Sequence, residues 1–213
     1  MSAAAGPPYG PADASKAPRY SGVRTFARCP YVESSAGVDV GFVGVPFDTA
    51  TSYRPGARFG PEAIRAGSAL LRPWHSALEV DVFTGRSIAD LGDLVVTPGN
   101  AEKTAGQIAA GLRDVIGAGA LPIVLGGDHS IVLGELRAHA EAAGGPLALV
   151  LLDAHADTWD QYYGERYFHG TPFRRALEEG LLLPERSLLA GMRGPLYAAS
   201  DLGDAREIGR AHV

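Results

Sequence analysis

Short apolar runs alternate with amphipathic segments along most of this chain of 213 residues, and this alternation restricts the possible folds most strongly. The runs 38–47, 121–127 and 146–153 are continuous and rich in Val, Ile and Leu, as expected of strands buried on both faces. Weaker strand signals occur at 87–96 and 186–194. Strands that alternate with helices predict βαβ units, a parallel sheet and helices on both of its faces, which is a three-layer α/β/α fold.

Three of the expected helices carry capping signals. Over 100–119, Asn100 can cap the start and Gly117 can end the helix. The apolar stripe of this helix consists of Ile108, Leu112, Val115 and Ile116. Over 171–180, Thr171 is the expected cap, with Pro172 in the first turn and Gly180 past the end. Over 55–72, Pro61 suits a first turn, and the predicted apolar side consists of Ile64, Leu70 and Leu71.

Composition divides the chain into two parts of unequal size. Residues 1–35 are rich in Gly, Pro, Ala and Ser, which predicts a flexible N-terminal arm without a core of its own. Residues 36–213 are expected to form one α/β domain. The segment at 210–213 has the pattern of a strand that is just beginning.

Charge argues against two classes of partner, nucleic acid and membranes, and the cysteine content indicates the compartment. The formal net charge is −5 and no basic stripe is visible, which argues against nucleic acid and anionic membranes. No apolar run approaches the ~18 residues that a membrane span needs. The N-terminus lacks the pattern of a signal peptide, and Cys29 is the single cysteine, so we expect a cytoplasmic protein.

Polar clusters follow two of the most apolar runs. One is Gly-Gly-Asp-His-Ser at 126–130, and the other is Asp-Ala-His-Ala-Asp at 153–157. Ligands of parallel α/β sheets bind beyond the carboxyl ends of the strands. If the extended conformation continues past residue 152, the side chains of Asp153, His155 and Asp157 point to the same side.

A single histidine or aspartate after a strand is more often a hydrogen-bonded surface group or a turn cap than a ligand. Two neighbouring carboxylates, however, repel each other unless a cation lies between them. We therefore predict a metal site at His129, Asp153, His155 and Asp157. Nitrogen and oxygen ligands without a thiolate favour Mn²⁺ or a related ion over a structural zinc. Asp128 and Ser130 are predicted to be turn residues or to support the ligands.

Taken together, these motifs resemble the ureohydrolases, the arginase–agmatinase family. GGDHS and DAHAD are similar to the two N-terminal metal signatures of that family. The segments GVPFDTATSYRPGARFGPEAIR (44–65), FHGTPFRRALEEG (168–180) and MRGPLY (192–197) look like further parts of an agmatinase-type sequence. The resemblance extends from about residue 18 to the end.

The resemblance implies an arginase-like fold and two Mn²⁺ ions that activate a water molecule against a guanidino group. By this resemblance, His129 would bind one ion together with Asp153 and Asp157. His155 would bind the second ion, and Asp153 would bridge both. His169 matches the family histidine that passes a proton to the leaving amine, and imidazole is suited to that role near neutral pH. The family also forms homo-oligomers.

The resemblance is incomplete at the C-terminal end. The family completes its metal site with aspartates in a pattern like S-x-D-x-D-x-x-D-P, and this pattern is missing here. Asp201 and Asp204 lie in a polar, helix-like segment instead. The chain therefore looks like the first two thirds of a ureohydrolase, with C-terminal strands missing and apolar surface uncovered.

The expected reaction is hydrolysis of a guanidino group to urea and an amine, most directly agmatine to putrescine. Trp159 and Asp160 are the predicted substrate-binding residues, the carboxylate facing the amine of agmatine. Arg166 would instead suit an anionic tail, so a guanidinobutanoate- or proclavaminate-type amidinohydrolase is the alternative. A fragment that keeps only part of the metal site and has no activity is the alternative from another class. A single-metal deacetylase with a related sheet is a more distant one.

Overall fold

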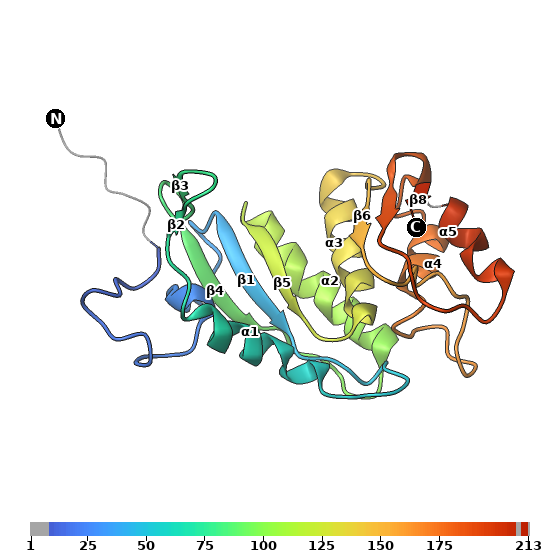
Figure 1. The fold of residues 1–213 in the computed structure, drawn as a ribbon, viewed down its shortest axis with the longest axis horizontal. Coiled ribbons are helices and arrows are strands. Elements are labelled where there is room, and N and C mark those ends of the chain that lie inside the picture. Colours follow the sequence, from blue (N-terminus) through green and yellow to red (C-terminus); the bar gives the residue numbers. More distant parts are fainter. Residues whose placement is uncertain (1–8, 208–209, 213) are drawn as a thin grey trace. The chain divides into compact units, whose positions relative to one another are not determined.

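The computed structural model describes residues 9–207 and 210–212, which form two compact units (Figure 1). Unit 1 comprises residues 9–46, 56–94 and 114–127. Unit 2 comprises residues 47–55 and 95–113 together with the described residues from 128 onward. The side chain of Asp204, for which the sequence analysis expects a polar, helix-like segment, lies outside the described part of the chain. No helix among the described residues is long and apolar enough to cross a membrane.

Unit 1 contains a three-stranded parallel sheet in the order β4-β1-β5. Its strands are β1 (Val40–Val45), β4 (Ile88–Asp93) and β5 (Leu121–Gly126), so all three predicted strands form. The central strand β1 is buried at every position after Val40, which agrees with its continuous apolar sequence. A small antiparallel pair, β2 (Trp74–His75) with β3 (Val80–Asp81), lies between α1 and β4 in sequence.

Helix α1 (Gly60–Ser68) buries a different side from the one predicted. Its buried residues are Pro61, Arg65 and Ser68, whereas Ile64 is 40% exposed. The Arg65 guanidinium donates to both carboxylate oxygens of Asp90, at 2.8 and 3.0 Å, and to Asp93 Oδ1 at 2.6 Å. The predicted apolar side was therefore wrong, because this fork of charged hydrogen bonds holds the helix against β4. Leu70 and Leu71 lie beyond the helix and are exposed.

The N-terminal segment differs from the predicted flexible arm over residues 25–32. A 3₁₀ turn, η1 (Phe26–Arg28), places Ala27 and Cys29 in the core of unit 1 beside Phe42. The Phe26 ring also stacks on Phe42, with centroids 3.8 Å apart. The sequence suggested an arm because this segment has too few apolar residues for its own core, but it shares the core of the sheet instead.

Helix α2 (Ala101–Gly117) forms as predicted. Asn100 Oδ1 accepts a hydrogen bond from the Lys103 backbone N–H at 2.8 Å, as an N-cap residue does. Ile108, Leu112 and Val115 are buried, so most of the predicted stripe faces the interior. A second 3₁₀ turn, η2 (Ala57–Phe59), precedes α1 in unit 1.

Unit 2 contains a second three-stranded parallel sheet, in the order β6-β7-β8. Its strands are β6 (Val150–Leu152), β7 (Leu188–Ala190) and β8 (Arg210–His212), which confirms the predicted start of a strand at the end of the chain. Besides most of α2, the helices of this unit are α3 (Val132–Ala143), α4 (Pro172–Glu178) and α5 (Gly203–Glu207). Its 3₁₀ turns are η3 (His129–Ile131), η4 (Pro184–Arg186) and η5 (Ala199–Leu202). The core includes Leu133, Leu136, Leu151, Phe173 and Leu189.

The end of α3 and the start of α4 show how these two helices are bounded. Gly144 ends α3 in the left-handed conformation, at φ 68°. Thr171 precedes α4 but makes no side-chain cap, because its hydroxyl accepts from the Phe168 backbone N–H and donates to a carbonyl of the preceding loop. Thr171 therefore occupies the predicted N-cap position and the helix begins where predicted, but the hydroxyl does not cap it.

Candidate metal centre

The turn after β6 supplies two of the predicted ligands. Asp153 directly follows the strand, whose last residue is Leu152. The chain then bends at residues 154–155, and Asp157 has a left-handed backbone with φ 50°. The expectation that the extended conformation continues to residue 157 was therefore wrong, and a tight turn determines where these side chains point.

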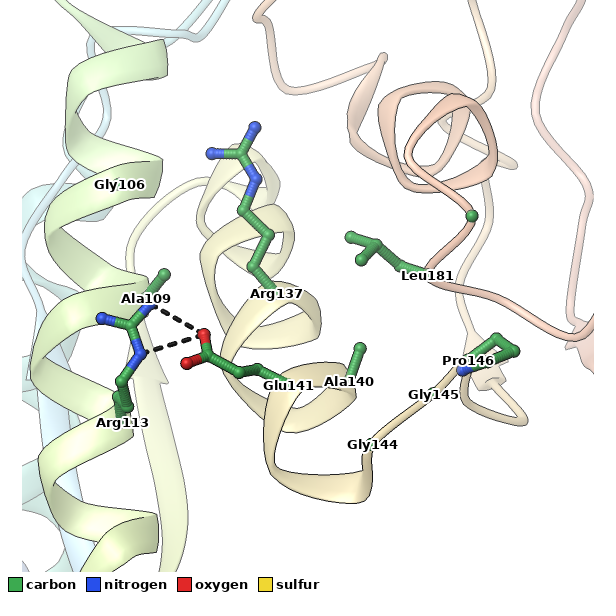
Figure 2. A pocket seen from close by; sticks show the side chains of 11 residues that line it. Gly106, Ala109, Arg113, Arg137, Ala140, Glu141, Gly144, Gly145, Pro146 and Leu181 are labelled. Atoms are coloured by element: carbon green, nitrogen blue, oxygen red, sulfur yellow. Dashed lines mark hydrogen bonds and ion pairs between the residues drawn. The ribbon is translucent and has the colours of Figure 1, made fainter.

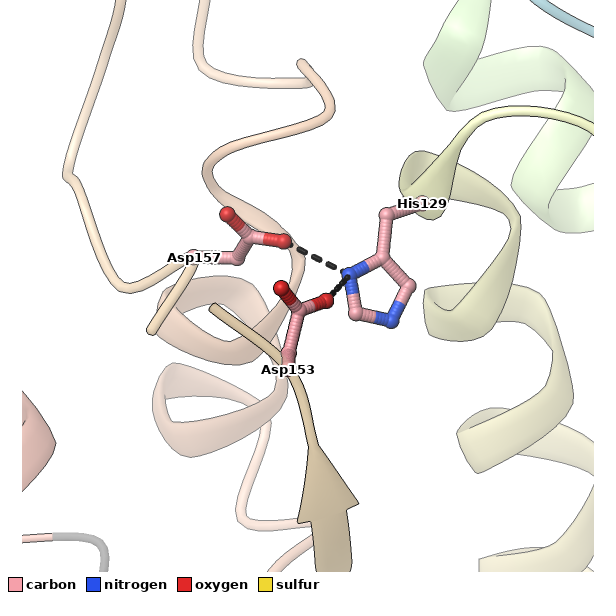
Figure 3. Close-up of side chains that lie close together, drawn as sticks. All are labelled: His129, Asp153 and Asp157. Atoms are coloured by element: carbon pink, nitrogen blue, oxygen red, sulfur yellow. Dashed lines mark hydrogen bonds and ion pairs between the residues drawn. The ribbon is translucent and has the colours of Figure 1, made fainter. Parts of the chain in front are cut away.

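Three predicted ligands converge in space: His129, Asp153 and Asp157 (Figure 3). His129 Nδ1 lies 2.6 Å from Asp157 Oδ2 and 3.4 Å from Asp153 Oδ2. One ligand atom from each residue lies within 4.8 Å of the other two. An imidazole nitrogen and two carboxylate oxygens are suitable ligands for a divalent ion such as Mn²⁺, Fe²⁺ or Zn²⁺.

The electrostatics of His129 reflect the two carboxylates. Burial disfavours the imidazolium, but the hydrogen bond and charge of Asp157, together with the charges of Asp153 and Glu135, outweigh that effect and raise the pKa of His129. A bound cation competes with this proton for Nδ1, since metal ligands must be deprotonated. The Phe173 ring meets the imidazole edge to face, at 5.4 Å between centroids, which limits how the ring can turn.

Asp128 and Ser130 support the cluster, as predicted. Asp128 Oδ1 accepts the Ser130 backbone N–H at 2.9 Å and thereby caps η3, the turn that begins with His129. Asp128 is buried, which raises the pKa of its carboxyl group. These contacts fix the backbone from which the His129 ring extends.

His155, the fourth predicted ligand, lies outside the converging group. Its side chain is 66% exposed, and its Nδ1 lies 3.6 Å from Asp153 Oδ1. Its backbone N–H donates to the same oxygen at 2.9 Å. A Cβ on Gly194 would come within 2.9 Å of the His155 ring, so a larger residue at 194 would shift this exposed ring. The sequence alone gave no physical reason to single out Gly194, since its segment (192–197) was noted only because it resembles the agmatinase-type sequences.

A hollow of about 570 Å³ opens beside Asp153 and His155. Its walls come from the carboxyl ends of β6 and β7, including Leu152, Ala190 and Arg193. This is the place where ligands of parallel sheets bind. A second cavity, of about 610 Å³, lies between α2, α3 and residues 180–181 (Figure 2). None of the predicted site residues lines it. Of its charged lining residues, Arg113 pairs with Glu141 at 2.8 Å and Arg137 pairs with Glu179 at 2.6 Å.

His169 lies in the loop before α4 and is partly buried. Its Nε2 is 3.1 Å from Ser52 Oγ, and its backbone N–H donates to Ala50 O at 3.2 Å. The Phe168 ring lies against the imidazole, with centroids 4.7 Å apart. Ser52 was missed by the sequence reasoning, since nothing local in residues 47–55 points to a partner 117 residues away.

The predicted substrate-binding residues lie in an aromatic group. The Trp159 ring stacks on Tyr162 at 5.1 Å and lies 5.7 Å from Tyr197. Asp160 Oδ1 accepts from the Arg175 guanidinium at 2.6 Å, and this ion pair lowers the pKa of Asp160. The Asp160 carboxylate is therefore already engaged by a cation of the protein.

Asp201 does not join the metal group. Its Oδ2 accepts the backbone N–H groups of Tyr197 and Ala198, at 2.8 and 3.1 Å. Within the described ranges 9–207 and 210–212, His129, Asp153 and Asp157 are the only three acidic, histidine or cysteine residues that converge in this way.

Known proteins resemble this chain over most of its length. A sequence model of the arginase family matches residues 38–212. Guanidinopropionase from Pseudomonas aeruginosa is 42% identical over 200 residues, covering 93% of this chain and 62% of that protein. The mitochondrial agmatinase of Gallus gallus is 45% identical over 177 residues, covering 83% of this chain and 52% of that protein.

Among solved structures, proclavaminate amidino hydrolase from Streptomyces clavuligerus superposes with a TM-score of 0.82 at 39% sequence identity. The alignment covers 92% of this chain and 65% of that one. The chain thus spans between 52% and 65% of the length of these three relatives. The superposition confirms the predicted α/β fold, and the match over residues 38–212 shows that the chain belongs to the arginase family.

Proposed function

We propose that this site hydrolyses a guanidino group to urea and an amine when a divalent metal ion is bound. The observation that carries the proposal is the convergence of His129, Asp153 and Asp157 at the end of β6. Two carboxylates in such proximity repel each other, and a cation removes that repulsion. The related guanidinopropionase and agmatinase support a guanidino compound as the substrate.

The three residues would hold the ion through His129 Nδ1 and one oxygen from each carboxylate. When bound, a divalent ion lowers the pKa of a coordinated water and so supplies a nucleophile near neutral pH. Asp153 offers its second oxygen toward His155, 3.6 Å from the ring, so Asp153 is the residue proposed to bridge to a second ion. His169 is proposed to deliver the proton to the leaving amine.

Mn²⁺ is the ion that we propose, because the ligands are nitrogen and oxygen with carboxylates in the majority. A second ion would have only His155 and the bridging Asp153 as protein ligands in the described chain. Two dications at bridging distance repel strongly, and the carboxylates here are few. We therefore expect one tightly bound Mn²⁺ per chain, measured by titration calorimetry. Two tight sites would contradict the proposed ligand set.

Agmatine is the substrate that we propose first. The Trp159 and Tyr162 rings offer faces that attract an organic cation, as cation–π contacts do. The ion pair of Asp160 with Arg175 argues against the prediction that the Asp160 carboxylate binds the amine of agmatine, because a cation of the protein already occupies it. The related guanidinobutyrase from Pseudomonas aeruginosa makes guanidinobutanoate the alternative substrate. Arg166, which would suit its carboxylate, is held by Glu178 at 2.7 Å.

The second candidate function is metal binding without turnover. It is favoured by the small number of converging ligands, since the described part of the chain brings together only His129, Asp153 and Asp157. The test is release of urea from agmatine, guanidinobutanoate and guanidinopropanoate, with Mn²⁺ or with EDTA. We expect slow release, fastest from agmatine, that requires Mn²⁺ and is lost in Asp157→Asn. Release that survives both EDTA and this substitution would disprove the proposed site.

A further inference from the structure

The loop at 47–55 contacts His169 through two separate atoms. Ser52 Oγ lies 3.1 Å from the imidazole Nε2, and Ala50 O accepts the His169 backbone N–H at 3.2 Å. One contact fixes the main chain of His169 and the other fixes the direction of its ring. The two loops are far apart in sequence, so these contacts are specific to the folded state.

The 47–55 loop is itself anchored beside the metal ligands. Asp128 Oδ2 accepts the Ala50 backbone N–H at 3.1 Å, and the Asp128 backbone N–H donates to Phe47 O at 2.8 Å. The Thr51 hydroxyl donates to Asp48 O at 2.9 Å. The buried Asp128, adjacent in sequence to His129, thus holds the same loop that holds His169. This connection gives His169 a defined place relative to the ligand-bearing turn.

We propose that Ser52 is a positioning residue for His169. This role deepens the proposed function, on which it rests, because a histidine that donates a proton must alternate between imidazolium and neutral imidazole. A hydroxyl both donates and accepts hydrogen bonds. When Nδ1 exchanges the proton, Nε2 keeps its hydrogen in both states and donates it to Ser52 Oγ, so this one contact keeps the ring in place throughout.

The contact also distinguishes the two ring nitrogens. Ser52 engages Nε2, which leaves Nδ1 as the nitrogen that exchanges a proton with the reacting amine. A carboxylate in place of Ser52 would accept from Nε2–H too, but its charge would stabilise the imidazolium and oppose release of the proton, and an ammonium could not accept from Nε2–H at all. A side chain without hydrogen-bonding atoms would leave the ring free to turn, and misplacement of a catalytic group by 1 Å can lower turnover about a hundredfold.

The first test observes the ring directly. In the full chain labelled at its histidines, ¹³C relaxation gives the order parameter of the His169 ring, assigned by comparison with His169→Gln. In Ser52→Ala we expect this order parameter to fall below about 0.6, the flexible range. Ser52→Thr keeps a hydroxyl and should retain the wild-type value. Thr51→Val is the matched control, because it removes a hydroxyl from the same loop without touching His169.

The second test is kinetic and uses the same variants with agmatine and Mn²⁺. Ser52→Ala should lower kcat about tenfold at a nearly unchanged KM, since only the proton-transfer geometry is lost. Ser52→Thr should restore kcat to within about twofold of wild type. If wild type releases no urea, the proposed function fails, while the relaxation experiment still decides the role of Ser52. An unchanged ring order parameter in Ser52→Ala, or an equal loss in Thr51→Val, would overturn the proposal.

Discussion

At the scale of single residues, the candidate metal centre depends on the Asp157 carboxylate. The turn after β6, and not the strand itself, directs this side chain toward His129. Asp157 lies 2.6 Å from His129 Nδ1 and has a left-handed backbone. Asp157→Asn removes one anionic ligand but preserves size, so it should weaken Mn²⁺ binding about a hundredfold or more. Asp160→Asn, in the same segment but outside the group, should bind Mn²⁺ like wild type. Titration calorimetry with both variants measures the difference.

Glu135 on α3 gives a prediction on pH. Burial raises the pKa of its carboxyl group to about 7, and the charge of His129 opposes this rise. A carboxyl group with a raised pKa in the folded state contributes stability below its unfolded pKa, and that contribution is lost as pH rises toward 7. In EDTA at pH 8, Glu135→Gln should therefore raise the free energy of unfolding by about 1–3 kcal/mol. At pH 5 the gain should be much smaller. Denaturant unfolding at both pH values measures it, and an equal gain at both would show that the charge is irrelevant.

At the scale of secondary-structure elements, α2 and α3 approach each other closely at one glycine. A Cβ on Gly134 would lie 2.6 Å from both Ala105 O and Ile108 Cβ. Because backbone and a branched side chain cannot move away easily, Gly134→Ala should destabilise the protein by about 1–3 kcal/mol. The control is Gly106→Ala on α2, where a Cβ meets nothing within 4 Å and helix propensity improves.

Thermal unfolding of the two glycine variants should give shifts of opposite sign. Gly134→Ala should lower Tm, and Gly106→Ala should leave it unchanged or raise it slightly. A similar shift in both variants would mean that the helix contact does not restrict residue 134. Comparing Gly134→Ala with Gly106→Ala separates the effect of side-chain packing from that of helix propensity, since both substitutions add the same methyl group to a helix.

At the scale of the whole molecule, each of the two parallel sheets has outer strands with exposed apolar side chains. Val150 and Leu152 of β6 are 67% and 78% exposed, and Leu121 of β5 is 58% exposed. β5 and β6 are outer strands in the orders β4-β1-β5 and β6-β7-β8. The predicted uncovered apolar surface is therefore present on these strands. Open strand edges with such side chains favour self-association.

Val150→Lys should reduce this self-association, because a charged side chain on an outer strand discourages pairing with another strand. Static light scattering over a range of protein concentrations measures the mean mass. Leu70→Lys is the control, since Leu70 is 73% exposed but lies outside any strand. If wild type is monomeric at all concentrations, the open strands are harmless and the expected homo-oligomer is not formed by this chain.

The sequence by itself determined the main strands and helices and their order, but not the β2–β3 pair or the turn at η1. Local patterns predict the strand at 38–47 and the helix at 100–119. A continuous apolar run and a helix cap each involve only residues that are close together in the sequence. The positions of His129 and Asp153 just after apolar strands were also readable, since the ends of parallel strands are where polar side chains gather.

Only the tertiary structure decided which of these side chains meet. It brought Asp157 to His129 through a left-handed turn and left His155 outside the group. It buried Arg65 against Asp90 where an apolar side was expected, paired Asp160 with Arg175, and placed Ser52 against His169. Each of these partners is distant in sequence or depends on one backbone angle, and local patterns carry no information about either. Packing of the whole unit selects them, because a buried charge or hydrogen-bonding group is stable only where a partner lies within reach.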